Sequence, residues 1–217
     1  MIMPKKIYIY SDEWFESTML CNPFMPLDHK LEDLYPNYYS VCYDCRLLLT
    51  EETESQIDSF KKIYETNDIN EMLDYVIRKN PQMVLLNGFD QKHFDIIIDY
   101  IKNVKILYLF KCNRIKDLSK LSICLNLECL HIDWNNKLES LWDMTNNKKL
   151  KVLSFERISK LTNISKLENS SLECITFDSR NILRQTKYEF NGDLDVFKKM
   201  KCLKHLKLYY KNIHIDY

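Results

Sequence analysis

The chain has 217 residues, of which 46% are hydrophobic and 29% are charged, a composition that predicts a folded domain and excludes a disordered chain. Its 31 basic residues balance its 31 acidic residues, so the overall charge argues against a nucleic-acid partner and against a membrane partner. Only two glycines occur, Gly88 and Gly192. A phosphate-binding loop or a dinucleotide-binding turn needs several glycines close together, so we expect neither, and no cofactor.

The N-terminal sequence lacks an apolar run long enough for a signal peptide, and no segment approaches the length of a membrane span. We therefore expect a cytoplasmic protein. The eight cysteines are then expected to be reduced thiols rather than a disulfide framework.

The first 80 residues carry a mixture of strand and helix signals. Alternation of Ile and Tyr predicts a strand over residues 5–10, three prolines interrupt residues 11–37, and residues 38–49 have strand composition. Thr53 and Gln56 form a capping box at the start of a predicted helix. Its apolar stripe is Ile57, Phe60, Ile63 and Tyr64. A second helix is predicted from about Asp68 to the residue before Pro81, with Ile69, Met72, Leu73, Val76 and Ile77 on one face.

A hydrophobic pattern, apolar-x-x-apolar-x-apolar, recurs at a fixed distance through the rest of the chain. It starts at Val104, Leu127, Leu150 and Leu172, so successive starts lie 23, 23 and 22 residues apart. The same phase extends back to Pro81. Its next start downstream is Leu203, a longer step that we interpret as an insertion near residues 183–193. A fixed period of this length is typical of repeat proteins.

In this pattern the chain resembles the leucine-rich repeat family, and most nearly its short, internalin-like class of about 22–23 residues. The resemblance implies an α/β solenoid with a parallel sheet on its concave face. It implies about six repeats over residues 81–217, preceded by residues 1–80 as a small α+β N-terminal cap. We expect the return segments to be short helices or 3₁₀ turns, and Ile213, Ile215 and Tyr217 to form a final edge strand.

Members of this family place an Asn after each strand, where its side chain bonds buried backbone groups. Four asparagines lie nine residues after a repeat start: Asn113, Asn136, Asn181 and Asn212. The third repeat has Ser159 instead, so the row of asparagines is interrupted there.

The repeat phase also predicts a binding surface, because alternate side chains of a strand face opposite sides. Leu107, Leu130, Leu153 and Ile175 are predicted to face inward, and the residues beside them outward. The predicted partner-binding residues are Ile106, Tyr108, Phe110, His131, Asp133, Trp134, Glu156, Asp178, Lys207, Tyr209 and Tyr210.

Two features single out this surface. Its aromatic residues offer contact area of the kind that dominates binding hot spots. In addition, Asp133, Glu156 and Asp178 fall on successive strands, which lie ~4.8 Å apart, and like charges placed opposite each other destabilise a sheet. A cationic partner would neutralise them; the alternative is a solvated surface whose carboxylates splay apart. We expect Asp133→Lys with Glu156→Lys to abolish binding without lowering the melting temperature.

Other candidate chemistry is weaker. Cys42 and Cys45, with Cys21 and His29 upstream, contain the ligand types of a zinc site. A strand at this position would place Cys42 and Cys45 on opposite faces, which argues against shared coordination. The five histidines show no metalloenzyme spacing, and no nucleophile motif occurs. We predict no catalytic residue and no metal ligand.

The predicted function is therefore non-enzymatic binding of a protein partner with a basic surface. By analogy of fold and charge, one such role is that of an immunity protein that neutralises a toxin. Two alternatives stay open: an adaptor or regulator that docks a cellular enzyme, and an enzyme with a metal or thiol site in the N-terminal region.

Overall fold

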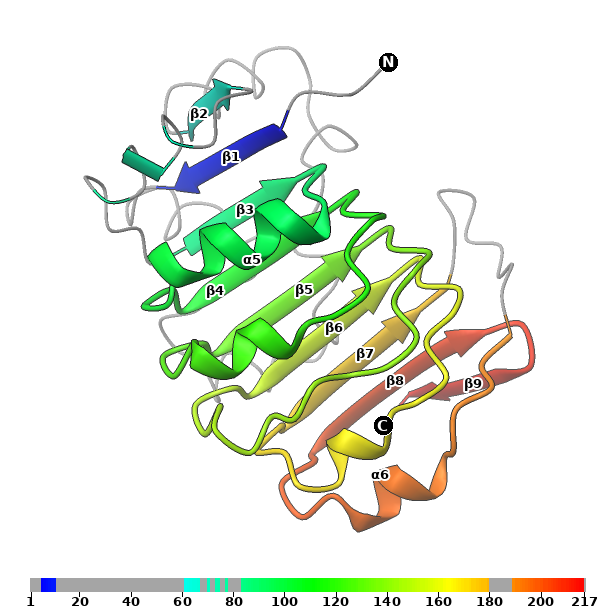
Figure 1. The fold of residues 1–217 in the computed structure, drawn as a ribbon. Helices are drawn as coiled ribbons and strands as arrows, with labels where there is room; N and C mark the ends of the chain where they lie inside the picture. Colours follow the sequence, from blue (N-terminus) through cyan, green and yellow to red (C-terminus); the bar gives the residue numbers. More distant parts are fainter. Residues whose placement is uncertain are drawn as a thin grey trace.

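The computed structural model describes residues 5–10, 61–66, 70, 73–74, 77, 83–179 and 189–216. These residues form an α/β structure built on one nine-stranded sheet of order β2-β1-β3-β4-β5-β6-β7-β8-β9 (Figure 1). The strands are β1 (Lys5–Tyr10), β2 (Lys61–Thr66), β3 (Met83–Asn87), β4 (Ile106–Phe110), β5 (Cys129–Asp133), β6 (Val152–Glu156), β7 (Cys174–Asp178), β8 (His205–Tyr210) and β9 (Ile213–Asp216).

Six neighbouring strands, β3 to β8, run parallel and follow one another in chain order. Their register matches the sequence spacing, since Leu107 pairs with Leu130, Leu130 with Leu153 and Leu153 with Ile175. All four side chains are fully buried and belong to one apolar core. The predicted inward positions are therefore confirmed.

The segments that return from one strand to the next cover one side of the sheet. They contain helix α5 (Gln91–Tyr100), the 3₁₀ helices η2 (Ser119–Ile123) and η3 (Ser165–Leu167), and helix α6 (Asp195–Lys199). Figure 1 shows α5 and α6 on the same side of the sheet. Short helices and 3₁₀ turns were expected here and are confirmed. Asp90 caps α5, because its side chain accepts a hydrogen bond from the backbone N–H of His93 at 3.0 Å.

The core lies between the sheet and these return segments. Apolar residues of the strands meet those of the returns, and towards the C-terminal end the contacts become aromatic. The rings of Phe155 and Phe177 have centroids 5.0 Å apart, and Phe177 also contacts Phe190 and Phe197. Each such ring is buried, and burial of a Phe side chain stabilises a fold by roughly 1.5–3 kcal/mol.

The N-terminal region agrees with the sequence in part. The strand over residues 5–10 is confirmed as β1, which pairs antiparallel with both β2 and β3. The helix predicted to contain Ile63 and Tyr64 is wrong for residues 61–66, which form strand β2. β-branched and aromatic residues suit a strand, and pairing with β1 outweighs the helical spacing. In the second predicted helix, Leu73 is buried, but Ile77 is 56% exposed and is not part of the buried stripe. The predictions for residues 11–60 concern residues outside those that the structure describes.

At the C-terminal end, the predicted final strand is confirmed as β9, antiparallel to β8. Most of the predicted insertion near residues 183–193 lies outside the described residues. Within the described part of the chain, no helix is long and apolar enough to cross a membrane.

The asparagine prediction was wrong by one residue. Asn135, not Asn136, bonds the buried backbone. Its side-chain amide donates to the carbonyls of Cys112 and Ile115 at 3.0 and 2.8 Å, and its oxygen accepts from the N–H groups of Lys137 and Leu138. Asn136 accepts a single bond from the Ser159 hydroxyl. The inward position of the turn therefore lies eight residues after the start at Leu127.

The other predicted asparagines differ from one another. The side-chain oxygen of Asn113 is buried and has no hydrogen-bond partner. Asn212 bonds both the N–H and the carbonyl of Phe190. Asn181 lies outside the described residues.

Candidate protein-binding surface

The predicted outward positions line up as rows across the parallel strands. One row runs Tyr108, His131, Ser154, Thr176 and Lys207, and the next runs Phe110, Asp133, Glu156, Asp178 and Tyr209. The alignment of the three carboxylates in adjacent strands is thus as the sequence indicated.

These rows are more buried than an open surface would be. Among the predicted partner-binding residues, only Trp134 is exposed, at 41%, and Tyr209 is half-buried. The others are buried: Ile106, Tyr108, Phe110, His131, Asp133, Glu156, Asp178, Lys207 and Tyr210. The expectation of a solvent-exposed aromatic and acidic face is corrected to a packed face with an accessible end.

Arg157 of this chain neutralises the first carboxylate of the row. Its Nε donates to Oδ1 of Asp133 at 2.7 Å, and its Nη2 donates to Oδ2 of the same carboxylate. The Tyr108 hydroxyl also donates to Asp133, at 3.4 Å, and Glu156 lies 4.0 Å from the guanidinium. Since Asp133 is fully buried, Asp133→Lys would bury a second cation against Arg157. The structure overturns the expectation that this substitution leaves stability unchanged.

The row from Tyr108 to Lys207 is polar. Burial, reinforced by the nearby positive charge of Arg157, lowers the pKa of His131 from 6.5 to about 3, so its imidazole is neutral. The ring meets Tyr108 edge-on, with centroids 4.6 Å apart. On the next two strands, the hydroxyls of Ser154 and Thr176 are buried and have no hydrogen-bond partner. The neutral His131 and the two hydroxyls do not resemble an acid–base pair.

Just past the strand ends, the chain adopts a left-handed conformation at four equivalent positions. Gly88, Lys111, Trp134 and Arg157 have φ values of 74°, 53°, 61° and 53°, and each directly follows the last residue of β3, β4, β5 or β6. Only Gly adopts this region without steric cost, and a residue with a Cβ pays roughly 1–2 kcal/mol. Residues in such conformations cluster at functional sites. The 23-residue spacing from Gly88 was the sequence signal that could have revealed the three non-glycine positions.

The left-handed turn presents Trp134 between two cations. Nζ of Lys111 lies 5.3 Å from the centroid of the indole ring, and Cζ of Arg157 lies 5.2 Å from it. Both distances fit a cation–π contact. Because the backbone N–H of Trp134 donates to Glu156 O at 3.0 Å, the exposed ring is held by main-chain and side-chain contacts together.

The two tyrosines at the end of β8 separate. The ring of Tyr209 stays on the outer face, with its centroid 4.1 Å from that of His214, and Nζ of Lys207 lies 4.9 Å from it. Tyr210 was predicted to belong to the same surface, and that placement is wrong. Alternation puts it on the inner face with Leu206 and Leu208, where its ring lies 5.1 Å from that of Phe190 and burial raises its pKa.

Most cysteines among the described residues are buried; Cys202 is exposed. Burial raises the pKa of the Cys112, Cys129 and Cys174 thiols to about 12, so they are protonated and unreactive at neutral pH. Within the described ranges, no group of three or more His, Cys, Asp or Glu side chains could hold a metal ion. The residues considered as zinc ligands in the sequence, Cys21, His29, Cys42 and Cys45, lie outside those ranges.

The chain matches no protein-family model, and neither a curated protein nor a solved structure shows significant similarity to it.

Proposed function

We propose that the protein is a non-enzymatic protein-interaction module of the leucine-rich repeat type. Three observations support the class: hydrophobic starts 22–23 residues apart from Val104 to Leu172, in-register parallel strands that follow that spacing, and short helices or 3₁₀ turns on the return. In a repeat solenoid each unit buries its apolar edge against its neighbours, which accounts for the continuous core.

The observation that carries the binding role is the setting of Trp134. A large aromatic side chain is left exposed at the end of β5, on a backbone conformation that costs free energy, and two cations hold it in place. Trp and Arg are the residues most enriched in interface hot spots. A pre-ordered ring loses little conformational entropy on binding, so its contact area contributes more fully to affinity.

The proposed partner is a protein with a basic surface that meets the end of the outer face. Glu156 lies on the strand next to Trp134 and Asp178 on the strand after that, both with 7% of their surface exposed, and the half-buried Tyr209 supplies a second aromatic contact. A cytoplasmic immunity protein that neutralises a cationic toxin domain is one form of this proposal. An adaptor that docks a cellular enzyme is the other, and it uses the same surface.

The test is capture of partners from a lysate of the source by the immobilised full chain and by two variants. Trp134→Ala removes the exposed ring. Leu125→Ala is the control, because Leu125 is 57% exposed at the other end of β5. We expect at least one protein retained by the wild type and by Leu125→Ala but lost with Trp134→Ala. If all three retain the same proteins, the role assigned to Trp134 is wrong.

A further inference from the structure

A second feature at the strand ends is a group of four cations, of which only Lys111 takes part in the proposed function, through its contact with Trp134. Lys111, Arg114, Lys137 and Lys160, here named the basic ridge, lie in the turns after β4, β5 and β6. Arg114, Lys137 and Lys160 are 23 residues apart and exposed, and Lys111 is half-buried beside Trp134.

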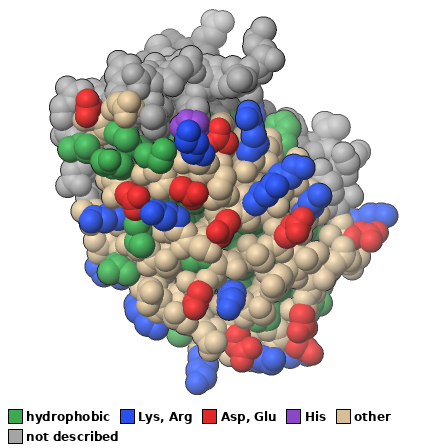
Figure 2. Space-filling model, viewed as in Figure 1, with side chains coloured by type: hydrophobic (Ala, Val, Ile, Leu, Met, Phe, Trp, Pro, Cys, Tyr) green, Lys and Arg blue, Asp and Glu red, His purple; other side chains and the backbone are tan. Residues whose placement is uncertain are grey.

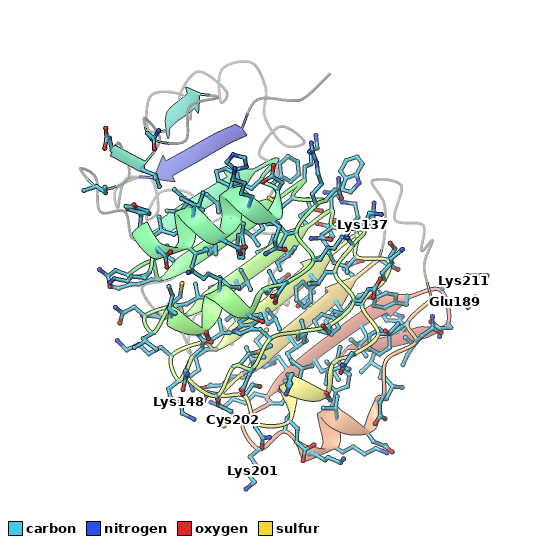
Figure 3. All side chains as sticks on the ribbon, in the orientation of Figure 1. Lys137, Lys148, Glu189, Lys201, Cys202 and Lys211 are labelled. Atoms are coloured by element: carbon cyan, nitrogen blue, oxygen red, sulfur yellow. The ribbon has the colours of Figure 1, made fainter. Side chains whose placement is uncertain are left out.

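Hydrogen bonds between the turns bring the ridge residues onto neighbouring levels. The side chain of Asn135 donates to the carbonyls of Cys112 and Ile115, on either side of Arg114 in the sequence. The Ser159 hydroxyl donates to Asn136, and these two residues are the sequence neighbours of Lys160 and Lys137. Adjacent levels of a parallel sheet are ~4.8 Å apart. Figure 3 shows Lys137 at the end of the sheet to which the parallel strands point, and Lys148 and Lys201 at the opposite end.

The charge of the ridge is not cancelled locally. Among the residues that the structure describes, none of the four side chains has a carboxylate within ion-pair distance. Nearby carboxylates have other contacts: Asp133 with Arg157, and Asp90 with His93. Figure 2 shows several Lys and Arg side chains gathered along this edge, with a few acidic side chains between them. Exposed cations without an ion-pair partner among the described residues, on three neighbouring levels, point to an anionic ligand.

We propose that the basic ridge binds an acidic segment of a protein. Four cations on three successive levels fit a short row of carboxylates, and exposed Lys and Arg side chains adapt to such a row at low cost. Single-stranded nucleic acid fits less well, because it needs open aromatic faces on which bases stack. Among the predicted partner-binding residues only Trp134 is exposed, so successive bases would find a single ring on which to stack.

This inference goes beyond the proposed function. It concerns an acidic rather than a basic group, and its test changes Arg114, Lys137 and Lys160 but neither Lys111 nor Trp134, so it stands or falls separately from the role of Trp134. One partner can carry both groups, or two partners can bind together.

The experiment measures binding of a fluorescein-labelled oligoglutamate peptide to the full chain at low salt by fluorescence anisotropy. The ridge variant is Arg114→Gln with Lys137→Gln and Lys160→Gln. The matched control, Lys148→Gln with Lys166→Gln and Lys201→Gln, removes the same charge from exposed lysines outside the ridge. Far-UV circular dichroism checks that both variants are folded. An oligothymidylate of equal charge is titrated in parallel.

We expect the ridge variant to bind oligoglutamate about tenfold more weakly than the wild type, because it loses three exposed charge contacts at once. The control should stay within about twofold, and added salt should weaken wild-type binding. Equal loss in both variants, or no binding by the wild type, overturns the proposal. Tighter, ridge-dependent binding of oligothymidylate also overturns it and assigns the ridge to nucleic acid.

Discussion

At the end of β5, a single buried carboxylate joins three parts of the molecule. Asp133 accepts hydrogen bonds from Tyr108 on β4 and from Arg157 after β6, and the same guanidinium lies against Trp134. A buried ion pair need not add stability over apolar residues, but removing one partner leaves an uncompensated buried charge. We therefore interpret the Asp133–Arg157 ion pair as a contact that positions the Trp134 ring.

His131 gives this packed face a pH dependence. Its folded-state pKa of about 3 lies below the ordinary 6.5, so as pH falls the unfolded chain binds the proton first. The stability contributed by the neutral ring is fully present above pH 6.5 and is lost as pH falls towards 3. We predict that between pH 7 and pH 5 the wild type loses about 2 kcal/mol more free energy of unfolding than His131→Phe. Phe keeps an aromatic ring beside Tyr108.

Urea unfolding of both proteins at several pH values measures this difference. Between pH 7 and pH 8 the two profiles should run parallel, which serves as the internal control. Parallel profiles over the whole range down to pH 5 would show that His131 is protonated in the folded chain.

At the scale of elements, each turn after a strand needs a group that satisfies its buried backbone. Asn135 does this with four hydrogen bonds, while Asn136 makes one with Ser159. We predict that Asn135→Ala lowers the free energy of unfolding by about 3 kcal/mol, since it leaves buried carbonyls and N–H groups unpaired. Asn136→Ala should cost less than about 1 kcal/mol. Chemical denaturation of the two variants checks this ranking. If both substitutions lower the free energy of unfolding equally, the special role assigned to Asn135 is wrong.

The elements differ in how far their sequence determined them. Strands β4 to β7 were predicted at the correct residues, because the inward leucines and their outward neighbours repeat every 22–23 positions. The turns were not, since Cys112, Asn135 and Ile158 occupy the same inward position with different chemistry. Strand β2 was mistaken for a helix because its pairing with β1, more than 50 positions earlier in the chain, outweighs local spacing.

For the candidate site, the sequence predicted which face of the sheet each side chain lies on but not how exposed the side chain is. Alternation correctly placed Tyr108, His131 and Asp133 on the outer face. It could not show that Arg157 reaches back to Asp133, because a long side chain can pair with any of several neighbours. The left-handed column was also missed, since Lys, Trp and Arg do not signal positive φ as Gly does.

For the whole molecule, the arrangement of strand directions limits pairing at the sheet edges. The parallel strands β3 to β8 are bracketed by antiparallel neighbours, β1 and β2 on one side and β9 on the other. A parallel stack ends in unpaired N–H and carbonyl groups that invite another chain, and a short strand that folds back covers them. On the β8 side, Leu208 pairs with Ile215 and Tyr210 with Ile213.

Removing β9 should therefore change the state of association. A chain ending at Asn212 keeps the side chain that bonds Phe190 but exposes the edge of β8. Because that edge then offers four residues of unpaired backbone, we predict self-association that increases with protein concentration, while the full chain shows no such shift over the same range. Size-exclusion chromatography with light scattering measures both proteins, and circular dichroism confirms that the shortened chain is folded. If the shortened chain is folded and has the same molar mass as the full chain at every concentration, β9 has no role in protecting the edge of β8.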